Sequence, residues 1–259
     1  MENLKLTMFY LGCLDCQYFR LVNCDDETRR YQSPISAILI QHPTLGNILY
    51  DTGNSPYSKR DYGAHINQIY PVKQFISIEE ALTSKGLTCG AIDRLIFSHL
   101  HFDHVGGLNY FAGTKAIKNV TVSRPELLNA CESVFTGNHG AYVKKLFDVD
   151  GVVYKPIEGT VELAPDLTLF VQQSHTPGVI GLIVKTRTEG NLIFTSDAVY
   201  TQDSWNYLIP PGGNINKTTN EFFDNIQYLK ELQKKYNATM IFGHDCDQIQ
   251  KWSRKGTIE

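Results

Sequence analysis

At residues 99–107 the sequence reads His99-Leu-His101-Phe-Asp103-His104-Val-Gly-Gly107, directly after the apolar run Ile92–Ser98 that predicts a buried strand. Three histidines and an aspartate within six residues are costly in a core and hard to explain as surface. Where a strand ends, the chain turns irregularly, so alternate side chains can converge on one point. Imidazoles and carboxylates are the ligands that zinc and similar divalent ions prefer. The stretch supplies too many ligands for one tetrahedral ion that keeps a position open for water, so it indicates two ions.

Three further residues of these chemical types follow apolar, strand-like runs later in the chain. They are His175, Asp197 and His244. A single histidine at a strand end is more often structural, because it can cap a turn by hydrogen bonding to the backbone. Four runs that each end in a metal-type ligand instead favour one metal site assembled from distant parts of the sequence.

Strand-like runs outnumber helical ones, and helices are expected in both halves of the chain. The predicted strands are Leu4–Leu11, Ser36–Gln41, Ile48–Asp51, Ile92–Ser98, Leu167–Gln172, Gly181–Thr186, Asn191–Thr195 and Ala238–Phe242. Capping signatures open three predicted helices, at Ser77–Glu80, Ser123–Glu126 and Thr218–Glu221. The longest of them carries an apolar stripe, which we expect in the core: Phe222, Ile226, Leu229 and Leu232. This order predicts one α/β domain over residues 1–259, a sheet sandwich flanked by helices.

The composition excludes partners that need a concentrated basic field. The net charge is −3, so we expect neither a nucleic acid nor a membrane surface as partner. The one dense basic run, Lys251–Lys255, is expected to be a solvated tail. Residues 1–12 do not resemble a signal peptide and no apolar run reaches membrane length, so we expect a soluble, cytoplasmic protein. The six cysteines, including the pair Cys13-Leu-Asp-Cys16, are expected to be incidental thiols rather than a structural metal or redox site.

Taken together, these motifs resemble the metallo-β-lactamase superfamily from about residue 36 to residue 247. H-x-H-x-D-H, the three later ligands and Asp51-Thr-Gly53 carry the resemblance. It implies a four-layer αββα sandwich and two divalent metal ions, with zinc the expected metal. The ligands that it implies are His99, His101 and His175 for one ion, Asp103, His104 and His244 for the other, and Asp197 as a bridge between them.

Two positions qualify the resemblance. Asp51 is expected to orient a ligand histidine rather than to bind metal itself. Val179 stands where relatives usually carry a further histidine, so the shape of the loop after His175 is left open while the ligand set is not affected.

Within the superfamily, the chain is most similar to N-acyl-homoserine lactonases. The segment Ile193-Phe-Thr-Ser-Asp197-Ala-Val-Tyr200 carries this likeness, because that branch has a tyrosine three residues after the bridging aspartate. The implied reaction opens the lactone ring through attack by a hydroxide that bridges the metal ions. Tyr200 and Asp103 are then expected to be catalytic, Tyr200 by stabilising the oxyanion and Asp103 by delivering a proton. An aromatic ring packed beside the site is the alternative for Tyr200.

Other activities stay open. The main alternative is hydrolysis of another small lactone, such as a pyridoxine-derived lactone, or of a thioester as in glyoxalase-type enzymes. A non-catalytic metal-binding protein is the remote alternative. We expect a small-molecule lactone as substrate and a monomer or homodimer as the assembly. Two long segments with aromatic residues, 13–34 and 202–218, are candidates for the pocket wall, although they could equally pack on each other.

Overall fold

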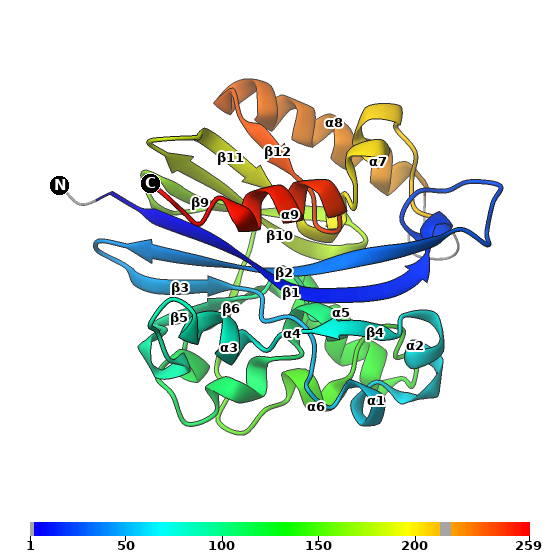
Figure 1. Cartoon of the computed structure of the whole chain (residues 1–259), viewed down its shortest axis with the longest axis horizontal. Helices are drawn as coiled ribbons and strands as arrows, with labels where there is room; N and C mark the ends of the chain where they lie inside the picture. The colour runs from blue at the N-terminus through cyan, green and yellow to red at the C-terminus, as the bar shows by residue number, and fades with distance from the viewer. Residues whose placement is uncertain (1–2, 213–218) are drawn as a thin grey trace.

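Two β-sheets lie face to face between outer layers of helices in the computed structural model, which describes residues 3–212 and 219–259 (Figure 1). The predicted α/β, four-layer αββα architecture is confirmed. The larger sheet has the order β13-β1-β2-β3-β5-β6-β7, with β4 pairing against the second half of β1. Its strands are β1 (Lys5–Gln17), β2 (Arg30–His42), β3 (Gly46–Tyr50), β4 (Val72–Phe75), β5 (Arg94–Ile96), β6 (Val120–Ser123), β7 (Tyr154–Ile157) and β13 (Thr257–Ile258).

The smaller sheet has the order β12-β11-β10-β9-β8. Its strands are β8 (Val161–Ala164), β9 (Leu167–Ser174), β10 (Thr176–Thr186), β11 (Gly190–Phe194) and β12 (Thr239–Ile241). The helices are α1 (Ser58–Asp61), α2 (Gly63–Ile69), α3 (Ile78–Thr83), α4 (Phe102–Val105), α5 (Arg124–Phe135), α6 (Lys144–Phe147), α7 (Gln202–Tyr207), α8 (Thr219–Tyr236) and α9 (Cys246–Arg254).

Parallel strand pairs in both sheets bring distant segments together. In the larger sheet Tyr50 at the end of β3 pairs with Ile96 at the end of β5. In the smaller sheet Phe194 at the end of β11 pairs with Ile241 at the end of β12. Because the carboxyl ends of parallel strands meet at the same edge of a sheet, the residues that follow each pair become neighbours. In the larger sheet, Asp51 and residues 98–104 therefore meet beyond the ends of β3 and β5. In the smaller sheet, Asp197 and His244 meet beyond the ends of β11 and β12.

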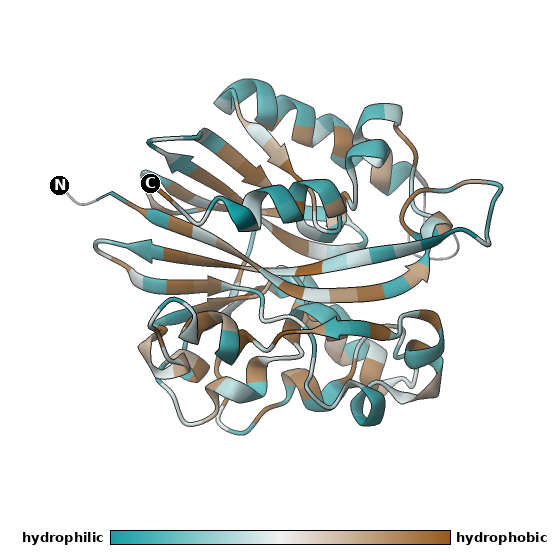
Figure 2. Ribbon diagram, in the orientation of Figure 1, coloured by the Kyte–Doolittle hydropathy of each residue, from teal (hydrophilic) through white to brown (hydrophobic). Residues whose placement is uncertain are grey.

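Buried apolar side chains fill the space between the layers. Leu6, Ile40, Ile48 and Leu182 belong to the cluster between the sheets and are fully shielded from solvent. Each such side chain contributes about 1.5–3 kcal/mol to stability through its removal from water. Figure 2 shows the corresponding pattern, with hydrophobic residues along the strands and hydrophilic residues on the exposed sides of the helices.

The helix predictions hold where the structure tests them. Ser77 and Glu80 form the complete capping box at α3, and the Ser123 side chain caps α5. The α8 stripe packs on the outer face of the smaller sheet, with Phe222, Ile226 and Leu229 buried and Leu232 partly buried. The predicted cap at Thr218 lies outside the described residues.

The basic side chains Lys251, Arg254 and Lys255 are exposed as expected, but the expectation that the run forms a tail is wrong. Most of the run belongs to α9, whose Ile249 and Trp252 are buried in the cluster between the sheets. Lys255 forms a 2.6 Å ion pair with Glu189, and β13 then pairs with β1. The sequence conceals this helix because only two apolar residues, three positions apart, face the core among charged neighbours.

The first strand is longer than predicted. β1 continues to Gln17 after a shift of register between Tyr10 and Cys13, so Cys13 and Cys16 lie within a strand. All six cysteines are free thiols, and Cys13 donates to the Gln32 side chain at 3.0 Å. In the described parts of the chain, no helix is both long and apolar enough to cross a bilayer.

Candidate metal centre

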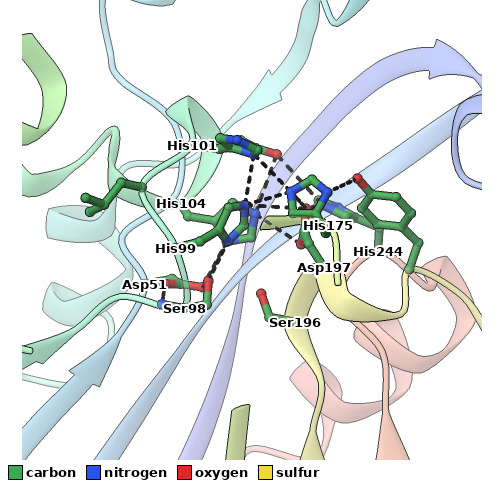
Figure 3. A network of polar contacts seen from close by, with 12 residues as sticks. Asp51, Ser98, His99, His101, His104, His175, Ser196, Asp197 and His244 are labelled. Carbon is green, nitrogen blue, oxygen red and sulfur yellow. Dashed lines mark hydrogen bonds and ion pairs between the residues drawn. The ribbon is translucent and has the colours of Figure 1, made fainter. Parts of the chain in front are cut away.

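All seven predicted ligands come together at the edge where the two sheets meet. Figure 3 labels each of them except Asp103. The larger sheet supplies the residues that follow β5, with His99 and His101 in the turn and Asp103 and His104 on α4. The smaller sheet supplies the other three, which follow β9, β11 and β12: His175, Asp197 and His244. Five of the seven are more than nine-tenths buried, and His101 and His175 are partly exposed.

The first trio is formed by His99, His101 and His175. His175 Nε2 lies 3.1 Å from His99 Nε2 and 2.9 Å from His101 Nδ1, and the latter two nitrogens are 3.1 Å apart. Three ring nitrogens that face one point at such short separations are the donor set of a divalent cation. The three rings meet edge to face, as their labelled side chains show in Figure 3.

The second trio is formed by Asp103, His104 and His244. Asp103 Oδ2 lies 3.8 Å from both His104 Nε2 and His244 Nε2. Two imidazoles and a carboxylate again match the preferences of zinc and related ions.

Asp197 lies between the two trios and contacts histidines of both, with Oδ2 as well as Oδ1 at 3.2 Å from His244 Nε2. Its Oδ1 is 3.2 Å from both His104 Nε2 and His244 Nε2. Its Oδ2 is 3.5 Å from His175 Nε2 and 3.8 Å from His99 Nε2. Within the described residues, Asp197 Oδ1 and His104 Nε2 are buried without a hydrogen bond of acceptable geometry. Buried polar atoms that lack such partners are costly, so these residues fit a pair of metal ions.

The rear nitrogens of the histidines are held by the protein. His104 Nδ1 lies 2.9 Å from Asp51 Oδ2, and His244 Nδ1 donates to the Pro34 carbonyl at 2.9 Å. Ser98 donates to Asp51 at 2.7 Å and lies 3.0 Å from His99 Nδ1. Asp51 therefore contacts a ligand histidine and is absent from both trios, as the sequence indicated. Contacts of this kind fix the ring orientation and tautomer of metal-binding histidines.

Burial and charge divide the histidines into two classes. Burial lowers the pKa of His99 and His101 well below the usual value and lowers that of His175 to about 4. These rings are neutral at pH 7, which is the form that binds metal. Burial also disfavours the charged form of His104 and His244, but the Asp197 carboxylate outweighs it and raises the pKa of both. A proton therefore competes with metal mainly at the second trio.

The backbone is strained at three positions around the centre. Asp51, His175 and Ser196 have φ values of 61°, 69° and 48°, although none of them is glycine. Such conformations cost about 1–3 kcal/mol each and cluster at functional sites. Gly106 is required for a different reason, because a Cβ there would lie 2.4 Å from the Ser55 backbone nitrogen. The Gly-Gly that ends the motif thus lets α4 approach the loop after β3.

A cavity of about 830 Å³ opens onto the centre. Its apolar wall includes Leu14, Leu21, Ile66, Ile69, Tyr70 and Phe102, and polar residues such as Asn129, Asn138 and Gln173 line other parts. Tyr200 also lines the cavity, and its hydroxyl oxygen lies 2.8 Å from His175 Nδ1. This volume suits a small organic substrate held directly above the two trios.

The two segments predicted for the pocket wall have different outcomes. Residues 13–34 contribute several lining residues, among them Leu14 and Leu21, so that prediction is confirmed. Residues 202–212 do not line the cavity and instead pack on the first segment, which is the alternative that the sequence left open: Ser204 donates to the Leu21 carbonyl at 3.1 Å, and the Gly212 N–H donates to the Phe19 carbonyl at 2.8 Å. Residues 213–218 lie outside the described residues.

Sequence reasoning missed the contribution of α2 and of residues 138–142 to the cavity. It also missed Tyr142, whose ring centroid lies 4.5 Å from that of His101. It missed Glu126 as well, which accepts a hydrogen bond from the Leu100 backbone between His99 and His101. Neither residue stands in a motif with a known spacing to the ligands. The one signal in the sequence is the Ser123–Glu126 signature, which by itself indicates only a helix cap.

Comparison with known proteins agrees with this geometry. The family model described as the metallo-beta-lactamase superfamily matches residues 30–244. The N-acyl homoserine lactonase AttM of Rhizobium radiobacter is 28% identical over 95% of this chain and 95% of its own length. The N-acyl homoserine lactonase AiiB of Agrobacterium fabrum is 28% identical over 86% of this chain and 83% of its own. A solved N-acyl homoserine lactone hydrolase, with the product N-hexanoyl-L-homoserine at its catalytic metal center, superposes with a TM-score of 0.83 at 26% identity and covers 97% of both chains.

Proposed function

The chain belongs to the metallo-beta-lactamase superfamily, and from this we propose that it is a metal-dependent hydrolase that opens the lactone ring of N-acyl homoserine lactones. The observation that carries the proposal is the pair of trios joined by Asp197 at the floor of the cavity. The activity printed for the relatives supports the choice of substrate.

We assign the first ion to His99, His101 and His175, and the second to Asp103, His104 and His244, with Asp197 between them. Zinc is the proposed metal, because imidazole and carboxylate donors at these separations suit it. When bound, two divalent ions supply a nucleophilic water at neutral pH and polarise the substrate carbonyl.

Tyr200 is proposed to donate a hydrogen bond to the oxygen of the lactone carbonyl. If His175 uses Nε2 as its ligand atom, Nδ1 carries the ring proton and donates to the Tyr200 oxygen at 2.8 Å. The phenol hydrogen is then free to point into the cavity. Because burial raises the pKa of Tyr200 well above its usual value, the hydroxyl stays protonated and can act as a donor.

Asp103 is proposed to carry the proton to the leaving alkoxide. Burial raises the pKa of this carboxyl, so Asp103 accepts a proton more readily than an exposed aspartate does. It also lines the cavity that would hold the lactone. The apolar wall around Leu21, Ile66 and Phe102 would receive the acyl chain.

A pH-stat screen of the zinc-loaded protein tests this proposal. The substrates are N-acyl homoserine lactones of several chain lengths, plain butyrolactone, a pyridoxine-derived lactone and a glutathione thioester. We expect the acyl homoserine lactones to give the highest kcat/KM and a chelator to abolish turnover reversibly. Preference for the thioester or the pyridoxine-derived lactone would overturn the assignment of substrate. No turnover of any of them would favour a non-catalytic metal-binding protein.

A cytoplasmic location and a monomer or homodimer stay predictions.

A further inference from the structure

Glu126 is a fully buried carboxylate that the proposed reaction does not use. Its position predicts a capping-box partner for Ser123, since it is the third residue of α5. The Ser123 side chain does accept from the Glu126 backbone N–H, at 3.2 Å. The Glu126 side chain, however, turns away from the cap. Its Oε1 accepts from the Leu100 backbone N–H at 2.8 Å.

Leu100 is the residue between the first two ligands, so this hydrogen bond holds the backbone that carries His99 and His101. The other oxygen of Glu126 accepts from the Tyr142 hydroxyl at 3.2 Å. The Tyr142 ring packs against the His101 imidazole, with 4.5 Å between the ring centroids. One carboxylate thus supports His101 both through its backbone and through its side chain.

The same end of α5 also holds the loop that carries the third ligand. The Ser123 hydroxyl donates to the Gly178 carbonyl at 2.6 Å, three residues after His175. The approach is so close that a Cβ on Gly178 would lie 2.1 Å from Ser123 Oγ. Contacts from α5 therefore reach both chain segments of the first trio, one from each sheet.

From this geometry we infer that Glu126 and Ser123 are positioning residues that set the alignment of His99 and His101 against His175. The inference rests on the proposed function, in that the trio is taken to bind a metal ion. Asp51 has the corresponding role at the second trio, through its contact with His104 Nδ1. Asp51 also reaches the first trio, but only indirectly, through Ser98 and His99 Nδ1.

Zinc titration against a chromophoric chelator tests this inference, with the two dissociation constants measured well below the unfolding temperature. In Glu126→Leu we expect one of the two ions to bind about 10–100-fold more weakly, as is usual when a residue that supports a ligand is removed. The other ion should keep its wild-type affinity. Glu126→Gln, which keeps an acceptor for Leu100, should lie between wild type and Glu126→Leu.

Glu132→Leu is the matched control, because Glu132 lies on the same helix and is exposed. It should leave both dissociation constants unchanged. Asp51→Asn should weaken chiefly the other ion, which His104 helps to hold, and the double variant with Glu126→Gln should weaken both strongly. If Glu126→Leu does not fold, Glu126→Gln and Ser123→Ala carry the test.

Two results would overturn the inference. One is a variant at residue 126 with a lower melting temperature but unchanged dissociation constants, which would make Glu126 a support of the fold only. The other is a wild-type protein that binds no zinc, which would remove the proposed function as well. The two failures are distinguished by the wild-type titration alone.

Discussion

At the scale of single residues, the centre depends on which nitrogen of each histidine faces the cavity. In four of the histidines, the ring nitrogen that faces the protein has a partner there. The pairs are His104 with Asp51, His99 with Ser98, His244 with Pro34 and His175 with Tyr200. These partners restrict each ring to one orientation before metal arrives, which lowers the entropy lost on binding.

Tyr200→Phe removes the hydroxyl without disturbing the ring. We expect kcat/KM for an acyl homoserine lactone to fall about 100-fold, because one donor to the developing oxyanion is lost. Bound metal, measured by atomic absorption, should not change. Tyr154→Phe is the control, since the Tyr154 hydroxyl donates to the Phe147 carbonyl away from the cavity. Unchanged kinetics in Tyr200→Phe would leave the residue with only an aromatic packing role.

Metal affinity should depend on pH, with a sign set by His104 and His244. Burial opposes their charged forms, but the Asp197 carboxylate prevails and raises the pKa of both rings. Below the raised pKa a proton must leave before metal binds, so affinity should fall steadily from pH 8 to pH 6. Zinc titrations at pH 6, 7 and 8 measure this dependence. The same affinity at all three values would contradict it.

At the scale of secondary-structure elements, the short helices beside the cavity are fastened by a buried carboxylate. Asp61, at the end of α1, accepts from the Ser55 hydroxyl and pairs with Lys145 of α6, each at 2.7 Å. Arg60 contacts the same oxygen as Lys145, Oδ1, also at 2.7 Å, while Ser55 donates to Oδ2. The loop after β3, α1 and α6 are therefore joined at one point.

Asp61→Asn should destabilise the protein by about 1–2 kcal/mol at pH 7. Burial alone would raise the pKa of Asp61, but the hydrogen bonds from Arg60, Lys145 and Ser55 prevail and lower it to about 2. A depressed folded-state pKa gives stability that is present above pH 4 and is lost as pH falls toward 2. The difference from wild type should therefore shrink between pH 7 and pH 3 in urea unfolding.

Asp148→Asn provides the comparison for this experiment. Its ion pair with Lys144 is exposed and 3.7 Å long, so we expect a change below about 0.5 kcal/mol. Equal changes in the free energy of unfolding would show that the buried Asp61 contacts stabilise the protein no more than an exposed ion pair does.

The sequence was informative wherever a local pattern determines the structure. The capping box at Ser77, the apolar stripe of α8 and the turn at His99–His104 each follow from spacing within a few residues. Spacing could not show that the Glu126 side chain leaves its helix cap for Leu100, because that choice depends on a loop 26 residues away. Helix α9 escaped prediction because two buried residues in nine make a weak pattern.

At the scale of the whole molecule, the metal centre connects the two sheets. Four of the seven ligands follow strand β5 of the larger sheet, and three follow strands of the smaller one. Bound ions would therefore act on the stability of the entire sandwich and not only on catalysis.

Removal of metal by a chelator should lower the melting temperature. At a metal concentration 100 times the dissociation constant, the stabilisation lost is about 2.7 kcal/mol per ion. For a chain of this size that amounts to roughly 5–10 °C per ion. Differential scanning calorimetry before and after chelation, and again after zinc is restored, measures the change. An identical melting temperature in all three states would mean that the ligands bind no ion.

The division of ligands between the sheets also bears on the order of events during synthesis. Residues 99–104 leave the ribosome long before His244 is synthesised. A growing chain therefore carries some ligands of both ions before the remaining ligands exist. The first trio can close once His175 has followed β9 into place, whereas the second cannot close until β12 has docked beside β11 and brought His244. Loading of the second ion, and so of the complete pair, is thus a late step that needs the finished sandwich.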